Sequence, residues 1–145
     1  MSYDLAVWAG PAPGDAAAAG AEFTRRYGAR IPGTPVAPAI AALVVALTDR
    51  FRDLTDLADD EIDVVDTPWA DGPLISNASG DFFYFSMTFS GAEAHLEAVV
   101  GIVRAHNLVC FDPQTGSVRC APEPAAGRPA TGGPPLRRGI FGRRR

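Results

Sequence analysis

The strongest indication of the fold comes from two adjoining stretches, DFFYFSMTF at residues 81–89 and SGAE at residues 90–93. The first stretch predicts a β-strand with large apolar side chains on both faces, which is typical of a strand in the middle of a sheet. In the second, Ser90 and Glu93 have the spacing of a capping box, which opens a helix. A central strand that leads directly into a helix predicts a domain of mixed α and β structure.

The hydrophobic pattern outward from this unit predicts the remaining elements. Alternation with a period of two indicates strands, and apolar residues spaced three and four apart indicate helices. The strands are expected at residues 3–8, 74–78, 82–89, 108–111 and 117–120. The helices are expected at about 15–27, from Thr34 or Ala37 to about 54, and at 90–107.

This order of elements is that of a ferredoxin-like split βαβ sandwich with an extra helix in the first crossover. We therefore expect an α+β fold with a four-stranded, mainly antiparallel sheet, helices on one face and a C-terminal hairpin extension. The second face of the sheet would be open. The aromatic side chains of the strand at 82–89 would then need cover from outside the fold.

The chain of 145 residues is expected to form a single α+β domain over residues 1–120. From 121 to 145 the composition changes to Pro, Gly, Ala and Arg, and the larger apolar residues are Leu136, Ile140 and Phe141. Such a stretch buries too little surface to offset its ordering entropy. Residues 121–145 are therefore predicted to be a flexible tail.

Charge is divided unevenly along the chain. All thirteen basic residues are arginine, and six of them lie between 128 and 145, where there is no acid. Residues 1–127 carry seven arginines against seventeen acids, a formal charge of −10. Nine of those carboxylates fall between Asp49 and Asp71. A field of one sign steers partners of the opposite sign, so the acidic body indicates a basic partner.

The acidic stretch supplies the predicted partner-binding residues. Its carboxylates would attract a basic protein surface, and its tryptophan would serve as an interface anchor. Solvation of the acids and burial of the tryptophan at the core rim are the alternative interpretations. The predicted residues are Asp59, Asp60, Glu61, Asp63, Asp66, Trp69 and Asp71.

No catalytic, cofactor or metal site is predicted. His95 and His106 lie on one predicted helix, ~16 Å apart along its axis at 1.5 Å per residue, and cannot share a metal. The acidic stretch lacks the glycine and terminal glutamate of a calcium loop. The loop at 10–14 contains two prolines, which remove amide donors that a phosphate loop requires. A small enzyme using either histidine is the least favoured alternative.

The cysteines and the N-terminus bear on the compartment. With a four-residue turn at 113–116, Cys110 would face Arg119 and the two sulfurs would lie on opposite faces, so reduced structural thiols are expected. Residues at the N-terminus have no signal-peptide pattern, and the longest apolar run, 37–47, is too short to cross a bilayer. The expected location is cytoplasmic.

Four segments carry a resemblance to a known group. YDLAVW at 3–8, PWADGPLI at 68–75, FFYF at 82–85 and LVCFDPQ at 108–114 resemble an uncharacterised family of small proteins from high-GC bacteria. The compact acidic α+β form of that family is similar to that of immunity proteins, which neutralise polymorphic toxins. The resemblance implies a non-enzymatic inhibitor that occludes a basic toxin surface with an acidic loop.

A second interpretation remains open. The chain could be a homodimeric α+β module that pairs through the aromatic open face of its sheet. Its arginine-rich tail would then contact nucleic acid or an anionic membrane.

Overall fold

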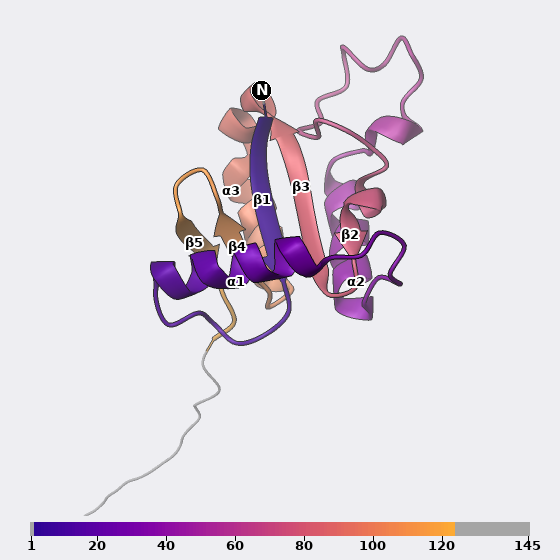
Figure 1. The fold of residues 1–145 in the computed structure, drawn as a ribbon. Coiled ribbons are helices and arrows are strands. Elements are labelled where there is room, and N and C mark those ends of the chain that lie inside the picture. The colour runs from indigo at the N-terminus through magenta and orange to yellow at the C-terminus, as the bar shows by residue number, and fades with distance from the viewer. Residues whose placement is uncertain (1, 124–145) are drawn as a thin grey trace, which may run out of the picture.

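A five-stranded antiparallel sheet organises the fold in the computed structural model, which describes residues 2–123 (Figure 1). The strands follow the order β2-β3-β1-β4-β5 across the sheet. Short 3₁₀ helices occur at Leu54–Asp56 and Leu74–Asn77. The strands are β1 (Ser2–Trp8), β2 (Ala78–Ser79), β3 (Phe82–Thr88), β4 (Val109–Asp112) and β5 (Ser117–Cys120), and the helices are α1 (Ala16–Ala29), α2 (Pro38–Arg50) and α3 (Phe89–Ala105).

The predicted α+β fold with an antiparallel sheet and a C-terminal hairpin is confirmed, and three details of the prediction are not. The sheet has five strands instead of four, because the terminal hairpin pairs with β1 and continues the same sheet. The predicted strand at 74–78 is a 3₁₀ helix followed by the two-residue strand β2. The third difference is that α1 lies on the face of the sheet opposite to α2 and α3, whereas all helices were expected on one face. The ferredoxin-like arrangement is therefore not confirmed in its details.

The strand-to-helix junction is as abrupt as the sequence suggests, but the cap differs. Helix α3 begins at Phe89, directly after β3. The side chain of Thr88 accepts a hydrogen bond from the Gly91 amide at 2.9 Å, so Thr88 is the N-cap, two residues before the predicted Ser90. The strand therefore passes into the helix with no intervening loop.

The main core lies between the sheet and the pair α2 and α3. Its strand residues alternate along β1 and β3, as expected for a sheet whose successive side chains point to opposite faces. Each fully buried side chain of this size stabilises the fold by about 1.5–3 kcal/mol. The buried members include Leu5, Val7, Ile40, Leu43, Leu47, Phe83, Phe85, Met87, Val99 and Val103.

Helix α1 covers the opposite face, where an open surface was predicted. Figure 1 shows it crossing in front of the sheet, while α2 and α3 lie behind. Phe23 of α1 packs against Phe111 and Phe82, with ring centroids 5.4 and 6.3 Å away. The alanine-rich helix can lie this close to the sheet because its side chains are small. At Gly20 an added Cβ would already lie within 4.0 Å of the Phe111 ring. The aromatic part of this face is thus covered from within the chain by α1, and the open aromatic surface that was expected is not found in residues 2–123.

Further along β1 and β3, past the crossing of α1, the same face of the sheet becomes polar (Figure 1). Asp4 accepts hydrogen bonds from the hydroxyls of Ser86 at 2.7 Å, Ser2 at 2.9 Å and Tyr84 at 3.0 Å. Burial and the neighbouring Asp4 raise the pKa of Tyr84 to about 12, so the phenol remains a donor at neutral pH. This half of the face is suited to water and needs no further cover.

A buried carboxylate ties the terminal hairpin to β1. Asp112 is fully buried and accepts hydrogen bonds from the Tyr3 hydroxyl, from Arg119 at 2.9 and 3.1 Å, and from the side-chain amide of Gln114 at 2.7 Å. The same Gln114 amide group bonds the backbone of Asp4 at 2.7 and 2.8 Å, extending the strand pairing through a side chain.

Because of the buried Asp112 carboxylate, we expect the stability of the fold to fall as the pH is lowered. Burial alone would raise the pKa of Asp112, but the hydrogen bonds from Tyr3, Arg119 and Gln114 outweigh it and lower that pKa. A carboxyl group whose pKa is lower in the folded state stabilises the fold at pH values above its unfolded-state pKa. This stabilisation is lost as the pH falls through the folded-state pKa. Asp112→Asn should therefore lower the free energy of unfolding by about 2–4 kcal/mol at pH 7.

Urea unfolding at pH 7 and at about pH 3 checks the expectation, because the difference from wild type should shrink below about pH 4. The exposed Asp60→Asn is the control and should change the free energy of unfolding little at either pH. A deficit for Asp112→Asn that stays constant between the two pH values would contradict this assignment.

Candidate functional site

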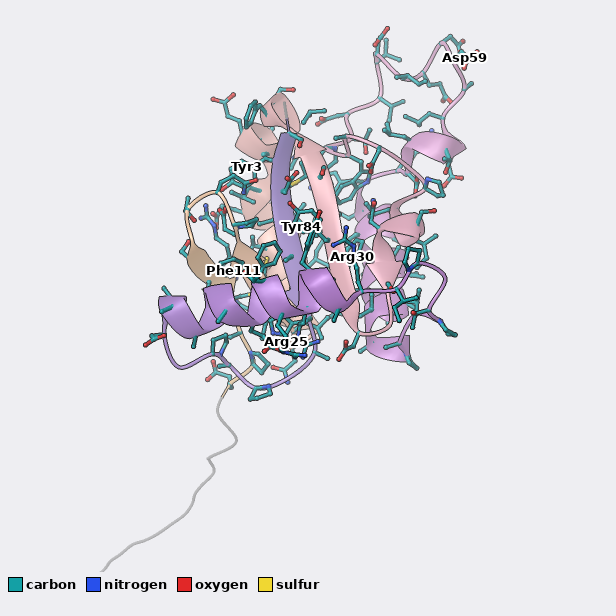
Figure 2. All side chains as sticks on the ribbon, in the orientation of Figure 1. Tyr3, Arg25, Arg30, Asp59, Tyr84 and Phe111 are labelled. Atoms are coloured by element: carbon teal, nitrogen blue, oxygen red, sulfur yellow. The ribbon has the colours of Figure 1, made fainter. Side chains whose placement is uncertain are left out.

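The acidic loop, residues 56–71, protrudes from one end of the fold. Figure 2 shows Asp59 at its outer end, far from the sheet. Helical turns give the loop its shape, with the amide of Glu61 bonded to the Ala58 carbonyl at 2.8 Å and that of Val65 to the Glu61 carbonyl at 2.9 Å. The Glu61 carboxylate also accepts from the Ala58 amide at 2.8 Å, which lowers the pKa of Glu61. The loop is therefore organised by its own backbone.

The returning end of the loop is bonded to the body of the protein. The Ala70 amide donates to the Ser86 carbonyl at 3.0 Å, and the Thr88 amide donates to the Pro68 carbonyl at 2.9 Å. The Thr67 hydroxyl reaches across to the Arg52 carbonyl at 2.6 Å. These bonds attach residues 67–70 to the free edge of β3 and to the start of the loop.

The position of Trp69 corrects its predicted role. Its side chain is 2% exposed, and its indole N–H donates to the Phe51 carbonyl at 3.0 Å. The ring also meets Phe51 and Phe85 edge-on, at centroid distances of 6.0 and 5.9 Å. Trp69 therefore anchors the loop to the protein's own core and, in this conformation, presents no surface to a partner.

A buried carboxylate holds the two ends of the loop together. Asp53, which is 7% exposed, accepts from the Leu74 amide at 2.7 Å and from the Thr55 amide and hydroxyl at 3.1 and 3.0 Å. A Cβ at Gly72 would stand 2.6 Å from the Asp53 carboxylate, so only glycine allows this approach. The loop thus has a closed, rigid base.

The helix α3 contributes a second close approach to this base. A Cβ at Gly91 would lie 2.6 Å from the Cα and 2.8 Å from the carbonyl oxygen of Pro68. These are backbone atoms of the loop, which is itself bonded on its other side, and they cannot move aside cheaply. Gly91 is therefore required for the loop base to rest against the first turn of α3.

Two glycines of the same helix provide a matched prediction. Gly91→Ala should lower the free energy of unfolding by about 1–3 kcal/mol, because the added methyl overlaps Pro68. Gly101→Ala meets nothing within 4 Å and should raise it by up to about 1 kcal/mol through the better helix propensity of alanine. Urea unfolding of both variants measures the two changes. Equal stabilisation by both substitutions would show that α3 and the loop are not in contact as described.

The structure separates the six predicted carboxylates into two groups. Asp66 bonds Nε2 of His95 at 2.8 Å, Asp71 accepts from Asn77 at 3.0 Å, and Glu61 lies 3.4 Å from the Arg52 guanidinium. The remaining three are exposed, and within residues 2–123 no ion pair involves them. These three are Asp59, Asp60 and Asp63.

Two apolar side chains on the acidic loop were missed as functional candidates. Ile62 is 48% exposed and Val64 is 76% exposed, and both lie among the carboxylates. The signal in the sequence was the presence of β-branched apolar residues in a stretch otherwise rich in Asp. Their exposure places apolar surface among the carboxylates at the tip of the loop, and an apolar centre inside a polar rim is the usual anatomy of a protein interface.

Both histidines have structural partners. The His95 ring lies 4.6 Å from the Phe51 ring and joins α3 to the loop through Asp66. Nδ1 of His106 bonds the Ile102 carbonyl at 3.0 Å, at the end of α3. In the part of the chain that the structure describes, no three His, Cys, Asp or Glu side chains are grouped to hold a metal ion.

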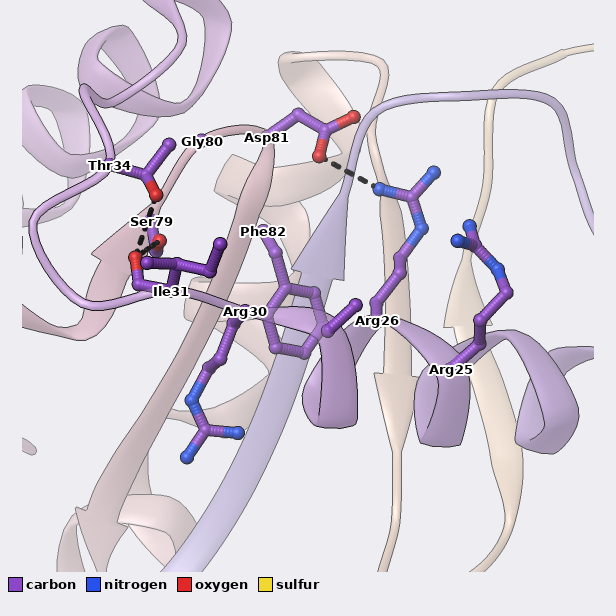
Figure 3. Close-up of a pocket in the computed structure, with 10 residues that line it drawn as sticks. Arg25, Arg26, Arg30, Ile31, Thr34, Ser79, Gly80, Asp81 and Phe82 are labelled. Atoms are coloured by element: carbon purple, nitrogen blue, oxygen red, sulfur yellow. Dashed lines mark hydrogen bonds and ion pairs between the residues drawn. The ribbon is translucent and has the colours of Figure 1, made fainter.

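An arginine-lined cavity of about 400 Å³ lies between α1 and the turn that joins β2 to β3 (Figure 3). Arg26 bonds Glu22 at 2.6 Å and Asp81 at 3.0 Å, and Arg25 bonds the same Glu22 at 2.6 Å. These bonds from Arg25 and Arg26 lower the pKa of Glu22 to about 2. Figure 3 shows Arg25 and Arg30 pointing apart, so the cavity does not focus positive charge on one point. At this cavity the ion pair between Arg26 and Asp81 attaches α1 to the turn between β2 and β3.

Comparison of the chain with protein-family models, with curated proteins and with solved structures gives no match. Among residues 2–123, no helix has the length and apolar character needed to cross a membrane. The acidic loop is thus the candidate functional site that the residues themselves define.

Proposed function

We propose that this protein is a non-enzymatic binding protein of the immunity type, whose acidic loop occludes a basic surface of another protein. One observation carries the proposal: exposed carboxylates protrude on a loop whose two ends are hydrogen-bonded to the core. The carboxylates are Asp59, Asp60 and Asp63, and the bonds at the base involve Asp53 and Trp69.

A loop with a fixed base is suited to binding because it is ordered before the partner arrives. Association loses translational and conformational freedom, and a preorganised loop reduces the second of these costs. The buried Asp53 and Trp69 perform that ordering. Occlusion by such a loop needs no chemistry beyond shape and charge, which is consistent with two histidines that are engaged in structural hydrogen bonds.

The charged and the apolar side chains of the loop would affect different steps of binding. Exposed carboxylates at the loop tip attract a basic surface over roughly one Debye length, ~8 Å at physiological salt, and so raise the association rate. Ile62 and Val64, once removed from water, would instead slow dissociation. The partner surface that fits this loop has arginine or lysine side chains around a small apolar patch.

The steering role of the loop can be tested with variants of equal charge. The probe is the purified product of the gene adjacent to the one that encodes this chain. Its binding is followed on a biosensor at low and high salt. The double variant Asp60→Asn/Asp63→Asn should slow association about 3–10-fold at low salt, with a smaller effect at high salt. The control Glu93→Gln/Glu97→Gln changes the charge equally on exposed positions of α3 and should leave the rate nearly unchanged. Equal effects of the two pairs would rule out the loop as the docking surface.

The apolar residues give a separate kinetic prediction. Ile62→Ala/Val64→Ala should raise the dissociation rate by about tenfold or more, corresponding to about 1–2 kcal/mol of lost burial, with little change in association. Both side chains are exposed in the free protein, so the free energy of unfolding should not fall. Unchanged dissociation in this variant would place the contact elsewhere.

A further inference from the structure

The two cysteines are direct neighbours across the terminal hairpin. Cys110 of β4 pairs with Cys120 of β5, whereas Phe111 pairs with Val118. Arg119 is therefore the extra residue of a β-bulge, and its side chain turns to Asp112. The regular register expected from sequence placed Arg119 opposite Cys110 and the sulfurs on opposite faces. The bulge shifts the pairing by one residue and brings the cysteines together.

Both cysteines also face the same side of the sheet. Each belongs to the core formed with α2 and α3, and both thiols are free and buried. Sγ of Cys120 lies 3.7 Å from the Leu108 carbonyl oxygen and 3.9 Å from that of Val100. Residues paired across antiparallel strands have Cα atoms about 4.5–5.5 Å apart, a separation that suits a disulfide.

We propose that Cys110 and Cys120 form an oxidation site, at which the folded protein takes up an intramolecular disulfide by exchange with a small-molecule disulfide. This site is independent of the acidic loop and of the proposed binding function. It would link β4 covalently to β5, the edge strand that ends the described fold.

The two thiols differ in character, which assigns their roles. The neighbouring Cys110 thiol and the Arg104 charge lower the pKa of Cys120 despite its burial. The neighbouring Cys120 and complete burial raise the pKa of Cys110. Cys120 is 8% exposed and lies on an edge strand, whereas Cys110 is fully enclosed. Cys120 is therefore the attacking thiolate and Cys110 the resolving thiol.

The exchange proceeds in two steps. The Cys120 thiolate attacks one sulfur of the small disulfide, forming a mixed disulfide and releasing one thiolate. Cys110 then gives up its proton and attacks Sγ of Cys120, which forms the protein disulfide and releases the second thiolate. The released thiolates take up protons. The protein loses two hydrogens in total, and the small disulfide is reduced to two thiols.

The experiment treats the full-length folded protein with hydroxyethyl disulfide, a neutral small-molecule disulfide. Intact mass spectrometry, with alkylation of the remaining thiols, should show loss of two hydrogens and no alkylation of either cysteine. Thermal unfolding of the oxidised protein should occur about 5–10 °C higher than that of the reduced protein. Dithiothreitol should reverse both changes.

Single-cysteine variants test the assigned roles. Cys110→Ser should accumulate a mixed disulfide at Cys120, because no second thiol resolves it. Cys120→Ser should react at least tenfold more slowly, because Cys110 is enclosed. In urea-unfolded protein the two variants should react at similar rates, which serves as the control.

Three results would overturn the proposal. The first is a folded wild-type protein that keeps two alkylatable thiols under conditions that oxidise the unfolded chain. The second is faster reaction of Cys110 than of Cys120 in the folded single variants. The third is an oxidised protein that unfolds at a lower temperature than the reduced one, since that would mean the native hairpin cannot accept the bond.

Discussion

The pairing of β1 with β3 sets the requirement that the helices and the acidic loop of this fold must meet. One face of the pair carries a continuous apolar row, and the other carries large apolar side chains only at the end with Trp8 and Phe82. Water must be excluded from both apolar regions, so a helix layer is needed on either side. The helices α2 and α3 cover one face, and α1 covers the aromatic part of the other. Further along the strands, to one side of α1, Asp4 and its hydroxyl partners replace apolar side chains, and no further cover is required.

The acidic loop depends on the same pair of strands. Residues 67–70 bond to β3, and the indole of Trp69 enters the core beneath it. Asp53 and the close approach at Gly72 then bring the two ends of the loop together. A highly charged segment is kept in a defined shape because its few apolar and hydrogen-bonding residues are buried at its base, which leaves the carboxylates at the tip exposed.

Several errors of the sequence-based prediction share one cause. Period and spacing predict that a residue is apolar-facing, but not which other element covers it. Phe82 and Tyr84 were correctly placed on one face, yet Phe23 of α1, rather than a second subunit, packs against them. Trp69 was placed in an acidic stretch, where neither interpretation could be preferred without knowing how the loop returns to β3. The predicted register of the terminal hairpin was wrong for a different reason. The bulge at Arg119 cannot be recognised in the hydrophobic pattern of the sequence.

The α+β class, the central aromatic strand, the helices and the concentration of acid between Asp49 and Asp71 could all be derived from the amino-acid order alone. These properties follow from local periodicity and from composition, which act over a few residues. Three further properties emerge only from the folded chain: α1 covers the aromatic part of the second face, Trp69 is internal, and Cys110 pairs with Cys120. Each of these depends on contacts between segments far apart in the chain or on a one-residue change in strand register, and the free energy of burial selects among such contacts only when the whole core is assembled.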